Sequence, residues 1–373
     1  MEVVVKRRLV STLVVITIIV LIAAAFQSRF FDLFAQSHDT AVNEDIYLPN
    51  GNVFEPVLPD NPVVLPRDFA FHYEYQHSWW HFFANVFDKQ GNQYSVQWSY
   101  FRIANHDTNL KGWLNSQLYI ANVVISNQQQ VWREQRIARG GIGQAGMSQK
   151  PFKIWIDNWY WRSLGLNPFP GMLSIETDQL KLSLHTSTSG PLVVPGERGY
   201  VQKHDLLPVA SHAITAPFLS VRGELQLNDG QPFQVEGKAW MSKEWGSGLL
   251  GQGQQGWDWF VINLDNQTTL SVSRYRQDKQ IPYLFGTLAS NDGKVIELNN
   301  EQLTIVPLNT TVIANEKSIP TQWQIAVPEY GINVEATTLN DELWLPFALP
   351  YWQGPIETQG SHQAQGFMQL VGY

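Results

Sequence analysis

The chain has 373 residues, a formal net charge of −8 and no cysteine. This length suits two domains of ordinary size, and a content of 44% hydrophobic and 16% charged residues is typical of a globular chain rather than a disordered one. The negative charge, with no basic run beyond the N-terminus, argues against nucleic-acid binding. The absence of cysteine excludes disulfides, thiolate metal sites and a cysteine nucleophile.

The N-terminal residues 1–36 predict a signal or anchor helix. Three basic residues, Lys6 to Arg8, precede residues 9–26, which carry no charge and would form a helix of about 27 Å, enough to span a bilayer. A cleaved signal peptide, with Ala23 to Ala25 as the cleavage site, is the alternative. In both cases the basic flank stays in the cytoplasm and the body is exported. In a Gram-negative cell we therefore expect it on the periplasmic side of the inner membrane, joined by an extended tether over residues 37–66.

The remainder predicts an all-β fold. Short alternating runs are separated by turn signals such as Asn228-Asp229-Gly230, and no long amphipathic helix with caps follows residue 36. The expected strands cover residues 78–87, 94–103, 118–125, 155–161, 180–185 and 219–227. We expect two β domains, 67–217 and 218–373, divided at a loop-rich connector over 195–217. The runs 219–227 and 233–240 could belong to either domain.

The stretch from Gly237 to Leu264 holds four tryptophans and two isolated acids, Glu244 and Asp258. Strand alternation places Trp257 and Trp259 on one face and Asp258 on the other, among large apolar residues. An unpaired buried charge is costly. Asp258 is therefore either buried with a hydrogen-bonding or arginine partner, or it faces a ligand as a binding or catalytic group.

Other constellations carry weaker signals. His77 and His81 share a face of one strand, and with His72 they could hold Zn²⁺, although polar histidines at a barrel rim are the simpler interpretation. No serine-hydrolase, P-loop or EF-hand motif is present, and the glycine-rich run at 140–146 is better explained by a tight turn. We expect no metal and no cofactor.

Ordered aromatic anchors along the whole body resemble the AttH/CrtC family, which includes carotenoid 1,2-hydratases and the AttH component encoded beside ABC transporters. The clearest segments are Ala239-Trp-Met-Ser-Lys-Glu-Trp-Gly-Ser247, Gly256-Trp-Asp-Trp-Phe260, Tyr351-Trp-Gln-Gly354 and the final Gly366 to Tyr373. Further matches are His72, Trp79, Trp80, Gln97, Phe101, Arg102, Arg136, Arg139, Gly140, Trp155, Asp157, Trp159, Tyr200, Lys203, Ser211 and His212. The resemblance implies two tandem lipocalin-like (calycin) β-barrel domains.

The sequence departs from the family pattern at five polar positions. Ser78 and Ser242 replace an expected Glu and Asp, Asn122 replaces a His, and Gln353 and Gln369 replace two Glu residues. In the hydratase branch the acid at the Ser242 position is expected to protonate an alkene, which serine cannot do. A neutralised pocket suits the binding of an apolar ligand.

The resemblance leaves three functions open, and with them whether the chain is an enzyme. The first is a membrane-tethered lipocalin-like protein that binds a lipophilic small molecule and serves an ABC-type export permease. The second is a hydratase or isoprenoid-modifying lyase that uses His212, Glu244 and Asp258. The third is a scaffold subunit without a ligand. The expected ligand-binding residues are Trp79, Trp80, Gln97, Arg102, Asn122, Trp240, Ser242, Trp245, Trp257, Trp259 and Trp352.

Overall fold

A computed structural model describes residues 54–104, 106–107, 110–313 and 316–373, which belong to one compact unit. The predicted N-terminal helix and residues 37–53 lie outside these residues. The described chain is built from two β-sheets, with three single-turn 3₁₀ helices at Arg67–Phe69 (η2), Gly112–Leu114 (η3) and Pro328–Tyr330 (η4). None of its helices has the length and apolar character needed to cross a bilayer.

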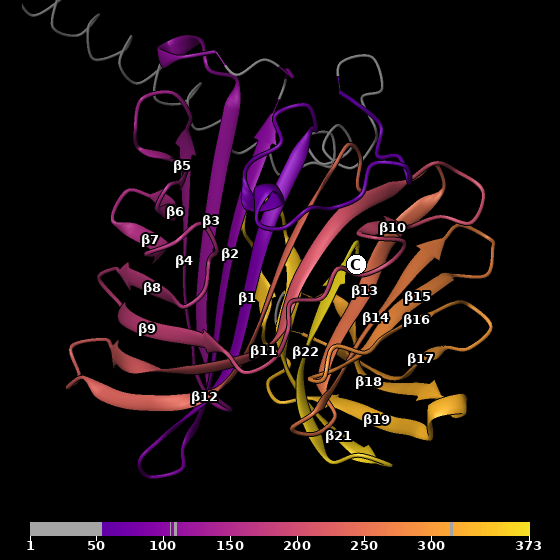
Figure 1. Ribbon diagram of the computed structural model, residues 1–373. Coiled ribbons are helices and arrows are strands. Elements are labelled where there is room, and N and C mark those ends of the chain that lie inside the picture. The colour runs from indigo at the N-terminus through magenta and orange to yellow at the C-terminus, as the bar shows by residue number, and fades with distance from the viewer. Residues whose placement is uncertain (1–53, 105, 108–109, 314–315) are drawn as a thin grey trace, which may run out of the picture. The chain divides into compact units, whose positions relative to one another are not determined.

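The first sheet follows the order β4-β3-β2-β1-β12-β11-β9-β8-β7-β6-β5, and β10 pairs with β11 (Figure 1). The two ends of this order approach each other, because Tyr100 of β2 donates a 2.8 Å hydrogen bond to the carbonyl of Trp155 in β6, and Arg136 of β4 bonds Asn158 beside it. The sheet thus curls into a nearly closed barrel. Its strands are β1 His77–Asp88, β2 Gln93–Ala104, β3 Gln117–Ser126, β4 Val131–Arg139, β5 Ala145–Gln149, β6 Phe152–Ile156, β7 Trp159–Ser163, β8 Gly171–Glu176, β9 Leu180–Thr188, β10 Tyr200–Gln202, β11 Ala210–Leu227 and β12 Phe233–Gly246.

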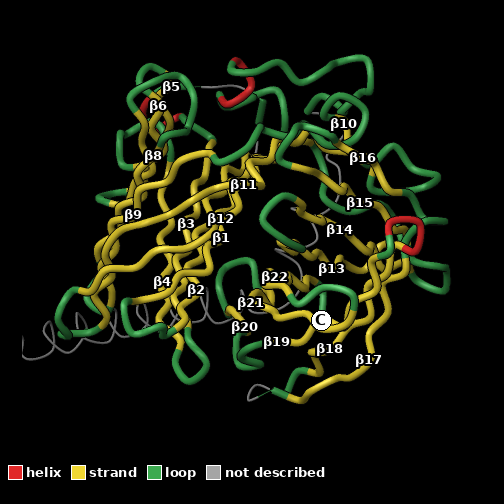
Figure 2. The backbone as a smooth tube through the Cα atoms, turned by 60° about the horizontal axis from the view of Figure 1, so that its bottom comes forward, coloured by secondary structure: helices red, strands yellow, loops and turns green. Residues whose placement is uncertain are grey.

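The second sheet follows the order β16-β15-β14-β13-β22-β21-β19-β18-β17, with β20 paired to β21, and curls into a half-barrel (Figure 2). All the pairings in both sheets are antiparallel, which fits connections by short turns. Its strands are β13 Gln254–Asn263, β14 Thr268–Gln277, β15 Tyr283–Ser290, β16 Val295–Leu298, β17 Thr304–Val312, β18 Ser318–Val327, β19 Ile332–Thr338, β20 Trp344–Leu345, β21 Tyr351–Gly360 and β22 Ala364–Val371.

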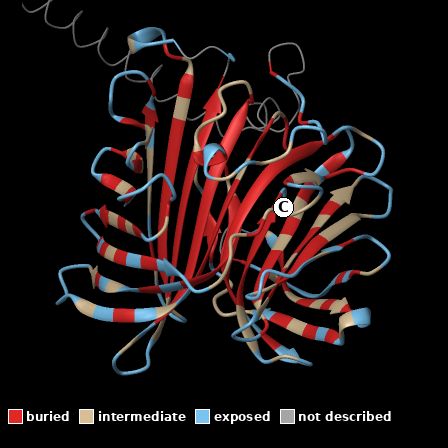
Figure 3. Cartoon of the chain, in the orientation of Figure 1, coloured by how far each residue is buried: buried red, intermediate tan, exposed pale blue. Residues whose placement is uncertain are grey.

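Burial separates two kinds of strand. Outer strands such as β8 and β9 alternate between buried and more exposed residues, as expected when only one face is covered. By contrast, ten consecutive residues of β1 are buried, and β2, β3, β12 and β22 contain long buried runs (Figure 3). These strands are covered on both faces, one by the interior of their own sheet and the other by the opposite sheet.

The interior of the first sheet is filled with aromatic rings. Its fully buried side chains include Trp80, Trp98, Trp159, Trp161 and Trp245. Burying each such ring removes about 150–250 Å² of surface from water, so they dominate the stability of a chain without disulfides. The interior of the first sheet is therefore filled by its own side chains. Its other face lies against the second sheet, and there the two sheets present aromatic and polar groups to each other.

The structure confirms the all-β class and the two barrel-like sheets, and it corrects several details. The predicted boundary after residue 217 falls within β11, because β11 and β12 both pair in the first sheet and the chain reaches the second sheet only after Gly246. The predicted strand 155–161 is two strands, since Asp157 adopts a left-handed turn conformation (φ 51°). The predicted tether is partly packed from Phe54 onward, where Phe54 and Val57 are buried.

Candidate functional site

The two sheets touch at a small apolar cluster. Phe83 of β1 and Trp240 of β12 meet Val261 of β13 and Phe367 of β22, and Trp259 packs against them. Phe83 stacks on Phe367 with ring centroids 4.9 Å apart and lies 5.5 Å from Trp259. We call these five residues the apolar contact. Period-two alternation continues the same face along each strand, so the residues on both sides of this contact also lie between the sheets.

A chain of neutral amides joins the sheets beside the apolar contact. Gln353 of β21 donates to the side-chain oxygen of Gln97 in β2 at 2.7 Å, and Gln369 of β22 donates to that of Gln353 at the same distance. The indole N–H of Trp257 completes the chain with a 2.9 Å bond to Gln369. The three glutamines are buried. Each amide in this chain is satisfied by another neutral group, so the chain needs no charge.

A second polar row crosses the first sheet. His81 lies directly opposite Ser242 on one side and Ser99 on the other, and Ser99 lies opposite Asn122. The His81 Nδ1 is 2.9 Å from the Ser99 hydroxyl, and Asn122 donates to the Tyr351 hydroxyl of the second sheet at 3.2 Å. Burial lowers the pKa of His81 to about 3 and raises that of Tyr351. Both side chains are therefore neutral at physiological pH.

The charged groups of this face, Lys203 and Glu244, lie at one end of it. Lys203 forms an ion pair with Glu244 of β12, and its ammonium lies over the rings of Trp79 and Tyr275, 5.3 and 5.8 Å from their centroids. Burial lowers the pKa of Lys203, but Glu244 and Tyr275 more than offset this and raise it. His77 stacks on Trp79 at 4.9 Å. Neither ring nitrogen of His77 has a hydrogen-bond partner, and burial holds its pKa well below the usual range.

These groups form the candidate site, which we call the inter-sheet cluster. Seven of its residues come from strands of the first sheet, Glu244 of the same sheet and Lys203 lie at one end, and six residues come from the second sheet. Trp257, Trp259 and Glu244 remain partly exposed, so the cluster is open to solvent on that side. Its members are His77, Trp79, His81, Gln97, Asn122, Trp240, Ser242, Lys203, Glu244, Trp257, Trp259, Tyr275, Tyr351, Gln353 and Gln369.

The structure brings about half of the predicted site residues to this cluster. Of the predicted ligand-binding residues, the cluster contains Trp79, Gln97, Asn122, Trp240, Ser242, Trp257 and Trp259, together with Glu244 of the predicted catalytic set. The others point into the sheet interiors. Trp80 and Trp245 belong to the core of the first sheet, and Trp352 is fully buried with its indole N–H on the Asp341 carbonyl.

Arg102 also lies in the interior of the first sheet and is fully buried. It donates to the carbonyl oxygens of His72 and Tyr75 at 2.9 and 2.6 Å and to the side-chain oxygen of Gln117 at 2.7 Å. Burial lowers its pKa to about 10, so it remains charged. Arg102, one of the residues predicted to bind ligand, thus holds the segment before β1 through its bonds to the backbone of His72 and Tyr75.

The three predicted catalytic residues are not assembled. Asp258 is completely buried on the interior face of the second sheet, where Arg274, Arg276 and the Tyr373 hydroxyl bind its carboxylate, at 2.8 Å for Arg274 and Tyr373. Glu244 faces the opposite sheet beside Lys203. Burial raises the pKa of Asp258, against the opposing effect of the two arginines. Of the two interpretations of Asp258, the structure therefore supports the buried acid with arginine partners.

His212, the third predicted catalytic residue, lies apart from both Asp258 and Glu244. Its ring packs between Trp245 and Tyr75, 5.4 and 5.8 Å away, at the end of the first sheet's interior, where residues 61–75 enclose a pocket of about 340 Å³. Burial lowers the pKa of His212 to about 4. His72 lines the same pocket, held by Glu74 at 3.0 Å and stacked on Trp245. His77 and His81 share the opposite face of the sheet, as predicted, so the three histidines of the zinc hypothesis do not converge, and no metal-ligating group of three was found among the described residues.

The family model for AttH-like proteins matches residues 56–373. The chain belongs to the AttH-like family. Among solved structures, this AttH-like chain is similar to a Nitrosomonas europaea protein assigned as an AttH, with 25% identity, a TM-score of 0.76 and coverage of 86% of this chain and 99% of the other. A search of curated proteins gave no match.

Two more distant structures share the fold of the AttH-like chain. Kievitone hydratase from Nectria haematococca aligns with 14% identity and a TM-score of 0.61, over 88% of this chain and 98% of its own. CghA, solved with Sch210972, aligns with 11% identity and a TM-score of 0.51, over 88% and 97%. At these identities the similarity is evidence for the fold alone.

Four of the five departures from the family pattern lie together. Ser242, Asn122, Gln353 and Gln369 are all in the inter-sheet cluster, where their neutral side chains form the two polar rows. The fifth, Ser78, faces the interior beside Arg102, whose Nε lies 3.5 Å from its hydroxyl. The departures that the resemblance implies therefore lie chiefly at one place in the AttH-like chain.

Sequence reasoning missed several members of the cluster. Tyr351 and Gln353 flank Trp352 in a segment that the resemblance singled out, yet only Trp352 was predicted to bind ligand. Strand alternation puts Trp352 on the face opposite its two neighbours. That signal would have found Tyr351. Tyr275 had no comparable signal, because its place beside Lys203 depends on a contact between distant segments.

Proposed function

We propose that this protein binds a lipophilic small molecule at the inter-sheet cluster without carrying out acid catalysis on it. The observation that carries the proposal is the pairing of aromatic rings with neutral hydrogen-bonding groups on one face. Rings of Trp79, Trp257 and Trp259 supply apolar surface, and the ring nitrogens of His77 and Trp240 supply polar groups with no partner in the protein. The buried amides beside them are neutral and hydrogen-bonded to one another. Sites for small molecules are commonly built in this way.

Unsatisfied groups in the cluster support a ligand of this kind. The two ring nitrogens of His77 and the indole N–H of Trp240 are buried without hydrogen-bond partners. A buried polar atom without a partner costs about 1–3 kcal/mol. A ligand with a hydroxyl or carbonyl group would recover part of that free energy. We therefore expect the ligand to be mainly apolar and to carry a neutral polar group.

A hydratase is the second candidate, because the fold is shared with kievitone hydratase. Protonating an alkene needs a strong, positioned acid. Glu244, the carboxyl group of the cluster, is ion-paired with Lys203, and Ser242 occupies the position expected for the acid. The pKa of Tyr275 is raised by burial to about 12 and that of Lys203 is raised as well, so neither is a stronger acid than usual. These groups favour binding over proton transfer.

Tryptophan fluorescence tests the binding. The full-length protein in detergent is titrated separately with palmitic acid, geranylgeraniol and β-carotene. We expect a saturable change in emission with at least one of them. The change should be reduced in Trp259→Phe but retained in Trp161→Phe, whose ring is in the core of the first sheet. Unchanged emission with every probe, or equal changes in both variants, would contradict a site at the cluster.

The cellular role that we propose is that of an accessory to an ABC-type export permease on the periplasmic side of the inner membrane, where the N-terminal segment anchors the protein or directs its export. This rests on the uncharged run at residues 9–26 and on membership of the AttH-like family. The test is co-purification of an ABC permease with the full-length protein from solubilised membranes of its own host. Recovery of the protein without any permease, after crosslinking in intact cells, would contradict this role.

A further inference from the structure

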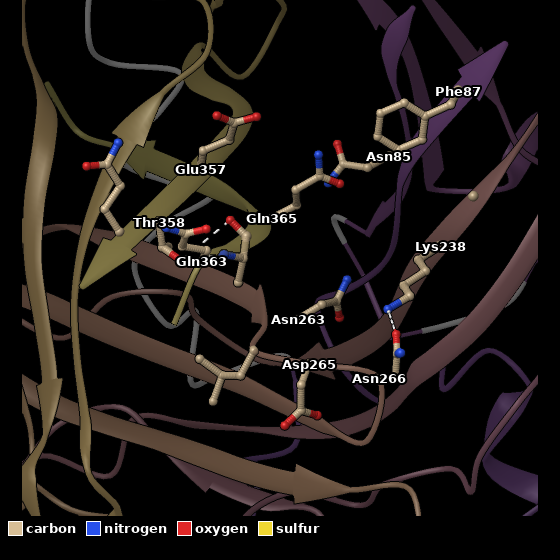
Figure 4. Close-up of a pocket in the computed structure, with 14 residues that line it drawn as sticks. Asn85, Phe87, Lys238, Asn263, Asp265, Asn266, Glu357, Thr358, Gln363 and Gln365 are labelled. Atoms are coloured by element: carbon tan, nitrogen blue, oxygen red, sulfur yellow. Dashed lines mark hydrogen bonds between the residues drawn. The ribbon is translucent and has the colours of Figure 1, made fainter. Parts of the chain in front are cut away.

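A second binding feature lies on the other side of the apolar contact. A cleft of about 850 Å³ opens there between the sheets, within the range of about 300–1,000 Å³ common for small-molecule sites. Its lining includes Asn85, Phe87, Lys238, Asn263, Glu357 and Gln365 (Figure 4). The stacked rings of Phe83 and Phe367 lie two residues along β1 and β22 from the cleft residues Asn85 and Gln365. They stand between the cleft and the inter-sheet cluster.

Strand alternation explains how the cleft acquires its lining. Two residues beyond Phe83, Trp240, Val261 and Phe367 on their strands come Asn85, Lys238, Asn263 and Gln365. Each therefore faces the same way as its apolar neighbour. Asn263 and Gln365 lie directly opposite each other in the ladder, and Gln365 lies opposite Glu357. Neighbouring strands of both sheets thus present amide groups to one space.

One buried polar group of the cleft, the side-chain oxygen of Asn85, has no hydrogen-bond partner. Asn85 is only 3% exposed and lines the cleft. Figure 4 shows the side chains of Asn85, Asn263 and Gln365 extending into the same space. A buried acceptor without a partner is costly. The simplest explanation for the Asn85 oxygen is that it accepts a hydrogen bond from a ligand.

We propose that this cleft binds a saccharide. An amide offers donors and an acceptor on the same group, as does a hydroxyl, so a row of amides matches a ring that carries several hydroxyls. Phe87, 36% exposed at the rim, offers an aromatic surface on which the apolar face of a sugar ring can pack. Glu357 adds a carboxylate, which accepts hydrogen bonds from hydroxyls strongly.

An ionic ligand fits less well. The Lys238 ammonium is already bonded to Asn266, as Figure 4 shows. The Asp265 carboxylate accepts 2.6 Å bonds from the backbone N–H groups of Gln267 and Thr268. These bonds satisfy the one cation and one of the two carboxylates that line the cleft. The proposal goes beyond the proposed function and does not depend on it, because the apolar contact separates the two places.

The test is calorimetric titration of the full-length protein in a detergent without a sugar head group. The probes are maltotriose, cellotriose, mannotriose, lactose and N,N′-diacetylchitobiose, and glucosyl diacylglycerol in mixed micelles as a lipid-borne sugar. We expect at least one probe to bind with a Kd in the range of about 1 mM or tighter. Free sugars and the glycolipid binding alike would mean that the ring alone is recognised, and binding of the glycolipid only would assign the sugar to a lipid head group.

Variants locate the binding. Phe87→Ala and Gln365→Ala should each weaken it about tenfold, equivalent to about 1.4 kcal/mol, while Gln129→Ala, at an exposed turn of the first sheet, should leave it unchanged. Thermal unfolding checks that each variant is folded, and Gln365→Ala serves alone if Phe87→Ala is not. No binding up to about 10 mM by any probe, or equal binding by all variants, would overturn the proposal. Lipid-induced fluorescence changes should persist in both cleft variants, which separates this proposal from lipid binding at the inter-sheet cluster.

Discussion

Gln353 donates its side-chain amide to the side-chain oxygen of Gln97 across the two sheets at 2.7 Å, although 256 positions separate them in the sequence. Both side chains are buried, and Gln369 extends the chain on the side of Gln353. The resemblance described in the sequence analysis implies glutamate at both positions of the second sheet. With amides at these two positions, the hydrogen bonds of the inter-sheet cluster are made without a carboxylate.

Introducing an acid at position 353 should destabilise the protein. In Gln353→Glu the buried carboxylate loses the donor to Gln97 and brings an unpaired charge into the cluster, so we expect a loss of about 2–4 kcal/mol in the free energy of unfolding at pH 7. Urea unfolding measures it. The folded-state pKa of the new acid would be raised, so the loss should disappear below about pH 4, where the acid is protonated in both states. Gln129→Glu, at an exposed position, is the control, and equal stability of the two variants would contradict the account.

Asp258 is expected to be a structural residue. Asp258→Asn leaves two partly buried arginines without their counter-ion, and breaking a buried ion pair in this way costs about 3–5 kcal/mol. Asp265→Asn changes an exposed carboxylate by the same atoms and should cost much less. Chemical denaturation of the two variants measures the free energy of unfolding that each substitution costs. A fully stable Asp258→Asn protein would return this residue to the catalytic candidates.

The buried histidines should make the protein less stable in acid. His81 has a pKa of about 3 when folded against about 6.5 when unfolded. Below pH 6.5 the unfolded state takes up a proton that the folded state does not, so stability is fully present above pH 6.5 and falls as the pH drops toward 3. Between pH 6.5 and 4.5 this amounts to about 2 kcal/mol for one histidine.

His81→Gln isolates that contribution. Glutamine can keep a hydrogen bond to Ser99, 2.9 Å from the His81 ring nitrogen, but it does not titrate. Denaturant unfolding of wild type and variant at pH 6.5 and 4.5 should therefore show a smaller loss for the variant, by about 2 kcal/mol. An identical pH dependence in the two proteins would mean that His81 is protonated as readily in the folded state as in the unfolded one.

The alternation of apolar and polar residues along the sequence was enough to predict the all-β class and part of the candidate site. Alternation along β13 correctly placed Trp257 and Trp259 on one face and Asp258 on the other. It could not assign β11 and β12 to a sheet, because an alternating strand does not encode which distant strand it pairs with. The same limit hid the bond between Gln97 and Gln353, since both come from separate sheets and meet only when these pack.

The most direct test of ligand binding at the inter-sheet cluster is mass spectrometry of organic extracts of the full-length protein, purified from membranes of its own host. The comparison is with Trp240→Ala, which opens the cluster at the apolar contact, and with the exposed control Gln129→Ala. We predict one enriched apolar molecule with a neutral polar group, present in wild type and control and depleted in Trp240→Ala. Extracts without any enriched molecule, or with the same molecule in all three proteins, would contradict the binding that we propose.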